Sequence, residues 1–273
     1  MSEEVKEVGL KASNTKLGNL LVFDCDHIMY IVGPNKKLTN SKGIPKLDAD
    51  GNPTYENKTL EETLDLADQY VKGVFARTNV DFYIGFFTTG KNFRYTVYPE
   101  YKANRKDVVK PPFYNEIKKY LMDKYKFTDY VGLEADDLVL IARKHYSKNY
   151  DCIVATTDKD ILMCPFECFD PKKGNWINTS KEEAYRFFWQ STIVGDGADN
   201  IKGLPGKGEA FVKKLFTDLK PEDYPGSILK EYIKQFGEEE GVRQFYVNYK
   251  ILRMVEESPV DYTIPDVIEV NNE

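Results

Sequence analysis

Carboxylate side chains form four clusters along the chain, each beside an apolar run. The clusters are FDCD (residues 23–26), LEADD (133–137), TTDKD (156–160) and GDGAD (195–199). An unpaired carboxylate among apolar side chains is unfavourable, because burial either costs free energy or forces the group to bind a proton. Cations remove this penalty, and hard divalent cations such as Mg²⁺ prefer carboxylate oxygens. The clusters therefore predict a polycarboxylate metal site and favour phosphoryl chemistry.

Two of the clusters, LEADD and TTDKD, each allow a second interpretation. Glu134 and Asp137 would share one face at the start of a helix, where acids also cap free N–H groups. Leu133 and Ala135 lie between and beside these acids and indicate burial, which favours metal ligation over capping. Asp158 and Asp160 could instead be turn residues at a strand end, and TTDKD alone does not decide between turn and ligand.

The FDCD cluster directly ends an apolar run and offers two acids. Asp24 and Asp26 would face opposite ways on a continuing strand, because side chains alternate along a strand. Only one of them is then expected in a site that the other clusters help to form. Asp24 is the expected ligand. Asp26 would bind the metal through water or hold the direct ligands in place.

The most specific element is GDGADNIKGLPGKGEAFVKKL, which begins at residue 195. It places Asp196 and Asp199 three residues apart, ahead of a tight glycine-rich hairpin and an amphipathic helix. Glycines let backbone N–H groups approach a phosphate, and a helix N-terminus favours negative charge. The element is similar to the helix–hairpin–helix that holds duplex DNA through its backbone. Its expected DNA-binding residues are Gly203, Gly206, Lys207, Gly208, Lys213 and Lys214.

A tract that joins aromatic and basic residues precedes the LEADD cluster. In VYPEYKANRK (97–106), Tyr101 could stack on bases, and three cations could hold phosphates: Lys102, Arg105 and Lys106. A solvated helix start is the alternative. The net charge is −6, yet residues 91–126 hold ten Lys or Arg against four Asp or Glu. A metal-neutralised acidic centre flanked by basic tracts would suit a phosphodiester polymer.

Short apolar runs alternate with segments of helical spacing in the first part of the chain. We expect buried strands at 20–23, 81–87 and 152–155, and helices at about 63–75, 112–125 and 133–146. This alternation predicts an α/β fold with a mostly parallel central sheet flanked by helices. The functional crevice of such a sheet lies at the carboxyl ends of its strands, so Asp24, Asp158 and Asp160 should meet at one edge.

Other segments differ in composition. Residues 31–60 are rich in Gly, Pro, Asn and Lys and should form a long loop or hairpin. After residue 180 the pattern becomes helical, which predicts a small helical region packed on the α/β core. Residues 256–273 are acidic and would form an ordered strap or a frayed tail. The composition is typical of a soluble globular protein, without a signal peptide or a membrane-spanning run, and we expect a cytoplasmic protein.

In this order the elements resemble the 5′-nuclease superfamily, which comprises flap endonucleases, the 5′-nuclease domains of bacterial DNA polymerases and phage 5′→3′ exonucleases. The matching segments are Asp24, YKANR (101–105), LEADD, TTDKD and GDGADNIKGLPGKG (195–208). The short chain, and YKANRK followed by KPP, are most similar to stand-alone phage exonucleases and RNase H-type replication nucleases that remove RNA primers.

The resemblance implies a PIN-like nuclease core at 1–180, with a basic arch or gateway at about 91–130. A helical DNA-binding region would follow at 181–273, with its helix–hairpin–helix at about 193–216. It also implies two Mg²⁺ or Mn²⁺ ions, K⁺ at the hairpin, and Lys102 and Arg105 as catalytic cations that steer the scissile phosphate. The implied ligands, direct or through water, are Asp24, Glu134, Asp136, Asp137, Asp158, Asp160, Asp196 and Asp199.

The activity implied is hydrolysis of phosphodiester bonds at 5′ ends or flaps of duplex DNA and RNA–DNA hybrids, in phage replication and primer removal. We expect a monomer in the host cytoplasm that meets replication proteins. One departure is Thr89, where most relatives place an aspartate. It leaves open a junction-binding protein with a degenerate metal site and little or no catalysis. A ribonuclease on a related scaffold is a third possibility, which the glycine-rich hairpin disfavours.

Overall fold

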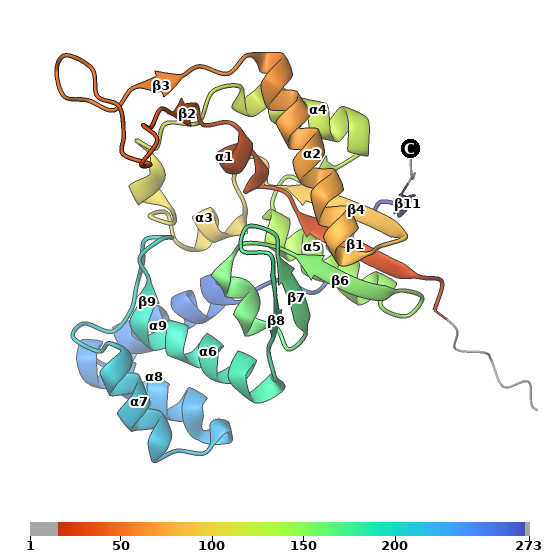
Figure 1. The fold of residues 1–273 in the computed structure, drawn as a ribbon. Coiled ribbons are helices and arrows are strands. Elements are labelled where there is room, and N and C mark those ends of the chain that lie inside the picture. Colours follow the sequence, from red (N-terminus) through yellow and green to blue (C-terminus); the bar gives the residue numbers. More distant parts are fainter. Residues whose placement is uncertain (1–15, 271–273) are drawn as a thin grey trace, which may run out of the picture.

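A seven-stranded, mostly parallel sheet forms the centre of the fold in the computed structural model, which describes residues 16–270 (Figure 1). The strand order is β11-β4-β1-β6-β7-β8, and β5 pairs with β4 outside this path. The strands are β1 (Asn19–Asp24), β4 (Phe82–Phe87), β5 (Thr128–Asp129), β6 (Asp151–Ala155), β7 (Glu167–Asp170), β8 (Asn175–Asn178) and β11 (Ile268–Glu269). Only β8 and β11 run antiparallel to their neighbours, so the expected α/β fold is confirmed.

Helices cover both faces of this sheet because β1 alternates its apolar side chains between them. Leu21 and Phe23 pack into the core formed with α1, α2 and α4, whereas Leu20 and Val22 face α5. The helices are α1 (Ile28–Val32), α2 (Leu60–Thr78), α4 (Tyr114–Tyr125) and α5 (Ala135–Tyr146). A parallel sheet buried on both faces in this way exposes the carboxyl ends of its strands as a natural site edge.

A second core lies among the helices of the C-terminal part, below the sheet in Figure 1. Its buried aromatic residues include Trp189, Phe216 and Phe245. The helices are α6 (Lys181–Val194), α7 (Glu209–Thr217), α8 (Tyr224–Phe236) and α9 (Glu238–Leu252), with the short ladder of β9 (Gly195–Asp196) and β10 (Ile201–Lys202) and the 3₁₀ turn η3 (Pro221–Asp223) between them. The helical pattern expected after residue 180 is confirmed.

The remaining segments are short elements between the helices and strands of the sheet part. Residues 31–60 form the expected hairpin, with β2 (Lys36–Lys37) paired to β3 (Tyr55–Glu56). Between β4 and α4 lie α3 (Phe93–Val97) and the 3₁₀ turn η1 (Ala103–Arg105), and a further turn, η2 (Lys159–Met163), follows β6. Between residues 16 and 270, the structure contains no helix with the length and hydropathy to cross a membrane.

Two features differ from the expectations. The hairpin of β7 and β8 was not predicted, because its residues lack the long apolar run of the central strands. Past α9 the chain returns to the sheet, where β11 pairs with β4 and ends the strand order on that side. The described part of the acidic C-terminal segment is therefore an ordered strap that packs with the sheet rather than with the helical region.

Candidate active site

Three acids meet at the carboxyl edge of the sheet, as the sequence predicted. Asp24 is the last residue of β1, while Asp158 and Asp160 follow the adjacent strand β6. The strands are parallel and in register, with Phe23 opposite Ala155. Thr156, the next residue of the chain, donates a hydrogen bond from Oγ1 to Asp24 Oδ2 at 2.8 Å. The strand pairing therefore holds the β1 and β6 ends together.

Asp26 lies on the same side as Asp24, which corrects the expectation that they face opposite ways. The alternation stops because β1 ends at Asp24 and the chain turns. Burial and the negative charge of Asp26 raise the pKa of Asp24 to about 7. Asp26 Oδ1 accepts a hydrogen bond from Thr88 N at 2.9 Å, so Asp26 brings a carboxylate to the end of β4. Thr89 stands beside that point.

The three acids at the start of α5 have different surroundings. Both oxygens of Asp137 accept hydrogen bonds from Arg94, at 2.6 and 2.9 Å, and Val255 N donates to Oδ1 at 2.9 Å. Asp136 forms no ion pair within residues 16–270. Burial and the neighbouring charges of Asp137 and Glu134 raise its pKa well above the usual range. Asp137 is thus neutralised by Arg94, whereas the negative charge of Asp136 has no paired cation among residues 16–270.

Glu134 connects α5 to the basic tract. Burial alone would raise its pKa, but the Lys102 ammonium and the Arg94 guanidinium outweigh burial and lower it. The Tyr101 hydroxyl donates to Glu134 Oε2 at 2.7 Å and lies 2.8 Å from Asp199 Oδ2. The Tyr101 side chain is only 2% exposed, so the prediction that it stacks on bases is wrong in this structure. Its hydroxyl instead bridges two acids from distant segments.

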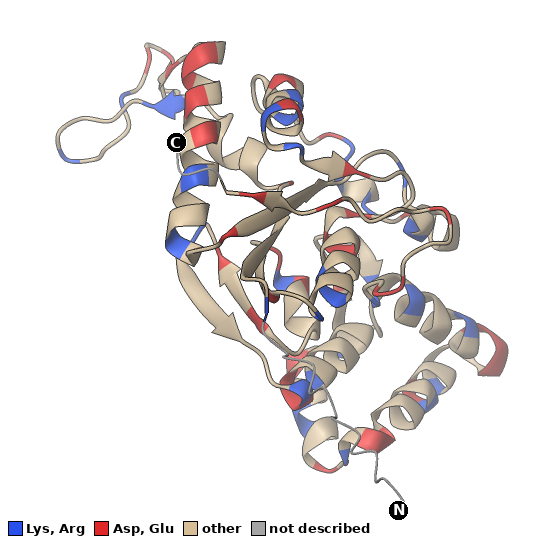
Figure 2. Cartoon of the chain, turned by 90° about the vertical axis from the view of Figure 1, so that its right-hand side faces the viewer, with Lys and Arg blue, Asp and Glu red and all other residues tan. Residues whose placement is uncertain are grey.

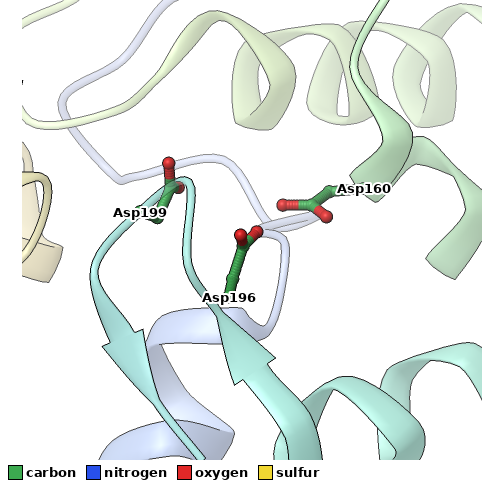
Figure 3. A group of neighbouring side chains, drawn as sticks. All are labelled: Asp160, Asp196 and Asp199. Atoms are coloured by element: carbon green, nitrogen blue, oxygen red, sulfur yellow. The ribbon is translucent and has the colours of Figure 1, made fainter. Parts of the chain in front are cut away.

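The loop between β9 and β10 brings a second group of acids to the sheet edge (Figure 3). One carboxylate oxygen from each of Asp160, Asp196 and Asp199 lies within 4.8 Å of the other two. We call these three residues the loop cluster. Burial and the charges of Asp158 and Asp196 raise the pKa of Asp160 to about 7.

Asp158 is close enough to influence the loop cluster and also Asp24 and Asp136. Its Oδ1 accepts a hydrogen bond from Asp160 N at 2.8 Å and caps η2. Its negative charge raises the pKa of Asp24, Asp136 and Asp160 alike. Asp158 therefore combines both earlier interpretations, since it caps a turn and is also electrostatically coupled to both groups of acids.

Cations surround the loop cluster. Lys102 forms ion pairs with Glu134 and, at 3.7 Å, with Asp199, and Arg105 pairs with Asp199. Lys159 lies 2.9 Å from Asp196. Sequence reasoning missed Lys159 and Arg94. A cation between two acids in TTDKD was a signal for the first, whereas Arg94 had none, because its partners lie far along the chain. Lys106 is exposed and forms no ion pair in the described part of the chain.

The glycine-rich segment adopts the expected tight turn. Lys207 N donates to Leu204 O at 3.0 Å, and Gly206 has φ +71°, which fits a type II turn with Pro205 at its second position. Gly203 has no room for a side chain, because a Cβ would lie 2.2 Å from Ile193 O. The turn leads through Gly208 into α7, whose Lys213 and Lys214 are exposed.

The charges of the helical region do not form one continuous basic face. Acidic and basic residues are interspersed over the helices in Figure 2. Lys207 is only partly exposed, lies 3.5 Å from Glu231 and stands over the Phe211 ring. In this region, only individual exposed cations that form no ion pair are therefore available to bind a phosphate.

Known proteins are similar to this chain in sequence and in fold. Residues 56–179 match the family described as 5′-3′ exonuclease, N-terminal resolvase-like domain. The exodeoxyribonuclease of Enterobacteria phage T3 is 32% identical over 164 residues, which cover 55% of this chain and 54% of that protein. DNA polymerase I of Bacillus caldotenax is 26% identical over 212 residues, covering 66% of this chain and 23% of the polymerase.

A solved structure of T5 5′-exonuclease with bound zinc ions aligns over 86% of both chains, with a TM-score of 0.55 and 18% identity. This likeness shows the fold. This chain spans about half of the phage T3 exodeoxyribonuclease and about a quarter of the polymerase. Residues 56–179 thus match the 5′-3′ exonuclease domain family, and the fold of the chain is similar to that of T5 5′-exonuclease.

Proposed function

We propose that this chain is a metal-dependent 5′-nuclease that hydrolyses phosphodiester bonds at 5′ ends or flaps of duplex DNA. The observation that carries the proposal is the meeting of the loop cluster with the acids at the strand ends. These acids come from segments up to 175 residues apart, from Asp24 to Asp199. Core packing does not explain why buried and half-buried carboxylates gather at one edge of a sheet.

The donor set fits divalent cations. The loop cluster offers three carboxylate oxygens within 4.8 Å, and Asp24, Asp136 and Asp158 offer hard oxygen donors beside it. The raised pKa values of Asp24 and Asp160 indicate uncompensated negative charge that a cation would relieve. We assign these six as the holding residues: Asp24, Asp136, Asp158, Asp160, Asp196 and Asp199.

We assign supporting roles to the other two acids predicted as ligands. Glu134 holds Lys102 in place, and Asp137 anchors Arg94. Asp26, at the end of β4, is the carboxylate best placed to compensate for Thr89. Mg²⁺ is the proposed physiological ion and Mn²⁺ a substitute, because both accept carboxylate and water ligands.

Bound divalent ions would supply an activated water and neutralise the charge that develops on the phosphoryl oxygens. The chain's own side chains would bind and orient the substrate. Arg105 and Lys106 are exposed at the mouth of the site and would attract the DNA backbone, while Lys102 is fixed deeper by Glu134. Tyr101 keeps Glu134 and Asp199 at hydrogen-bonding distance from one hydroxyl, which preserves the shape of the site.

The turn of residues 203–208 and the exposed lysines of α7 would hold the duplex beside the site. The backbone N–H groups at the start of α7 face away from the helix and are available to a phosphate. Contacts of this kind carry no sequence information, so cleavage would depend on the structure of the DNA end. K⁺ at this turn, RNA–DNA hybrids as substrates and a role in replication are finer parts of the same proposal.

The test is cleavage of a labelled duplex with a 5′ flap, in Mg²⁺, in Mn²⁺ and in EDTA. We expect products with either metal and none in EDTA, and product lengths that reveal whether single nucleotides or whole flaps are released. Parallel reactions with an RNA–DNA hybrid and with single-stranded RNA distinguish the substrate classes. Absence of products at every metal concentration would reject the nuclease.

A second candidate function is binding of DNA junctions with little or no catalysis. Thr89 is the observation that favours it, because a site with one carboxylate fewer holds its ions less tightly. Structure-selective DNA binding without cleavage in either metal would support this alternative over the nuclease.

A further inference from the structure

Lys159 places an ammonium group on the loop cluster. Its Nζ lies 2.9 Å from Asp196 and 4.0 Å from Asp160, at the position where the proposed function requires a divalent cation. Asp196 is buried, and Lys159 is the one cation paired with it among the described residues. In this structure Lys159 therefore neutralises part of the loop cluster.

The three cations around the cluster differ in how firmly they are held. The Lys102 side chain is 19% exposed and contacts both Glu134 and Asp199. Arg105 is 48% exposed and donates a second hydrogen bond, to Ala198 O at 3.1 Å. Lys159 is 57% exposed and donates one hydrogen bond, to Asp196.

Lys159 can therefore leave its acid most readily. Its flexible four-carbon stem starts at the surface, and rotation of the stem would carry the ammonium into solvent at the cost of the ion pair with Asp196 and the longer 4.0 Å contact with Asp160. Lys102, in contrast, is itself largely buried, so it would have to leave Glu134 and Asp199 without an open path to solvent.

We propose that Lys159 is an exchangeable counter-ion, which leaves Asp196 when a divalent ion binds and then binds a phosphate of the substrate. The proposal rests on the proposed function. A divalent ion on Asp196 repels a nearby ammonium, whereas the phosphodiester that approaches the ion attracts it. The same side chain would thus neutralise part of the loop cluster in the absence of metal and bind a backbone phosphate of the DNA once metal is present.

The first measurement is the affinity for Mn²⁺ alone, by calorimetry on metal-free protein. Lys159→Ala should bind Mn²⁺ about threefold more tightly than the unmodified chain, because the competing ion pair is gone. Lys159→Arg keeps the competing charge and should not show this gain. Lys173→Ala is the matched control, since Lys173 also is an exposed lysine beside a buried acid, 3.0 Å from Asp170 and outside the site.

The second measurement is the affinity for a 5′-flapped duplex in Ca²⁺ at several salt concentrations, with gels to verify that the DNA stays intact. Lys159→Ala should bind more weakly, and the slope of log affinity against log salt should fall by about one. Lys173→Ala should match the unmodified chain in both measurements.

Opposite changes, tighter metal and weaker DNA, would support the exchange. A loss of both affinities would show that Lys159 merely maintains the site, and an unchanged Mn²⁺ affinity would show that it does not compete with metal. Either result would overturn the proposal. Failure of the unmodified chain to cleave the flap would reject the nuclease instead, while the Mn²⁺ comparison would still decide whether Lys159 and metal compete.

Discussion

The two groups of acids in the site limit their mutual repulsion in different ways. We call Asp24 and Asp26, at the end of β1, together with Asp136, at the start of α5, the strand-end group. Its members form no ion pair in residues 16–270, and burial raises the pKa of each of them. The loop cluster is instead surrounded by Lys102, Arg105 and Lys159. Repulsion in the first group therefore favours proton binding, whereas the loop cluster recruits side-chain cations in addition to the raised pKa of Asp160. We expect metal binding to compete with protons in the first group and also with ammonium and guanidinium groups in the second.

The largest expected effect comes from Asp158, which couples the two groups. Asp158→Asn should lower the cleavage rate by about a hundredfold or more, because a lost ligand weakens the metal site. Duplex affinity without metal should stay within about twofold, since the turn and α7 are untouched. Rates on a labelled flap and anisotropy on the same DNA are the measurements. Asp151→Asn, at the opposite end of β6, is the control; equal loss of binding and cleavage would remove the distinction between metal site and duplex clamp.

Protonation of the strand-end group should make metal binding pH-dependent. The pKa of Asp24 is raised to about 7, so the folded protein holds a proton there below that pH. A cation must then displace the proton, and Mn²⁺ affinity should fall as pH drops from 8 to 6. Calorimetry in buffers with different ionisation enthalpies measures the protons released. Proton release that does not change across this range would show that Asp24 is ionised before metal binds.

Tyr101 offers a smaller perturbation, because its hydroxyl contacts Asp199 of the loop cluster and Glu134, two residues before Asp136 of the strand-end group. Tyr101→Phe keeps the buried ring but removes the hydroxyl that donates to Glu134 and lies 2.8 Å from Asp199, and the lost hydrogen bond contributes about 1 kcal/mol. We expect about a tenfold fall in kcat/KM and a lower melting temperature. Tyr98→Phe is the control, since Tyr98 donates to the exposed Glu100 at 3.4 Å. If both variants behave alike, the bridge does not matter to the site.

The smallest effect is expected at the duplex-binding surface. Lys213→Ala should lower duplex affinity in a sequence-independent way and reduce its salt slope by about one. Lys207→Ala should have the weaker effect, because Glu231 already holds Lys207. Anisotropy titrations on two unrelated sequences test both variants. A loss confined to one sequence would contradict recognition through the backbone.

Sequence reasoning found the parts that depend on local patterns. Asp24, Asp158 and Asp160 were predicted to meet because strand ends of a parallel sheet share an edge. The tight turn at Gly206 was readable because a Pro-Gly pair favours a type II turn. Both rules need only a few neighbouring residues.

The tertiary partners of the site residues could not be read in this way. Arg94 and Asp137 are 43 residues apart, and no periodicity links them. Tyr101 was assigned to DNA because aromatic residues in basic tracts often stack on bases, whereas Tyr95 and Ile201, among others, form a buried cluster around it. Asp26 was misplaced because the end of β1, just two residues earlier, cannot be predicted that finely.

The Arg94 side chain also reaches the end of α9, where its Nε donates to Ile251 O at 2.9 Å. Val255 N completes the same junction by donating to Asp137. During synthesis, α5 and the sheet strands from β1 to β8 leave the ribosome well before residues 251–255 do. The nascent chain would therefore carry its acids without the junction that sets α3 against α5. The proposed nuclease activity would appear only after residues 251–255 have joined α3 and α5, which limits contact between an incompletely folded site and nearby nucleic acid.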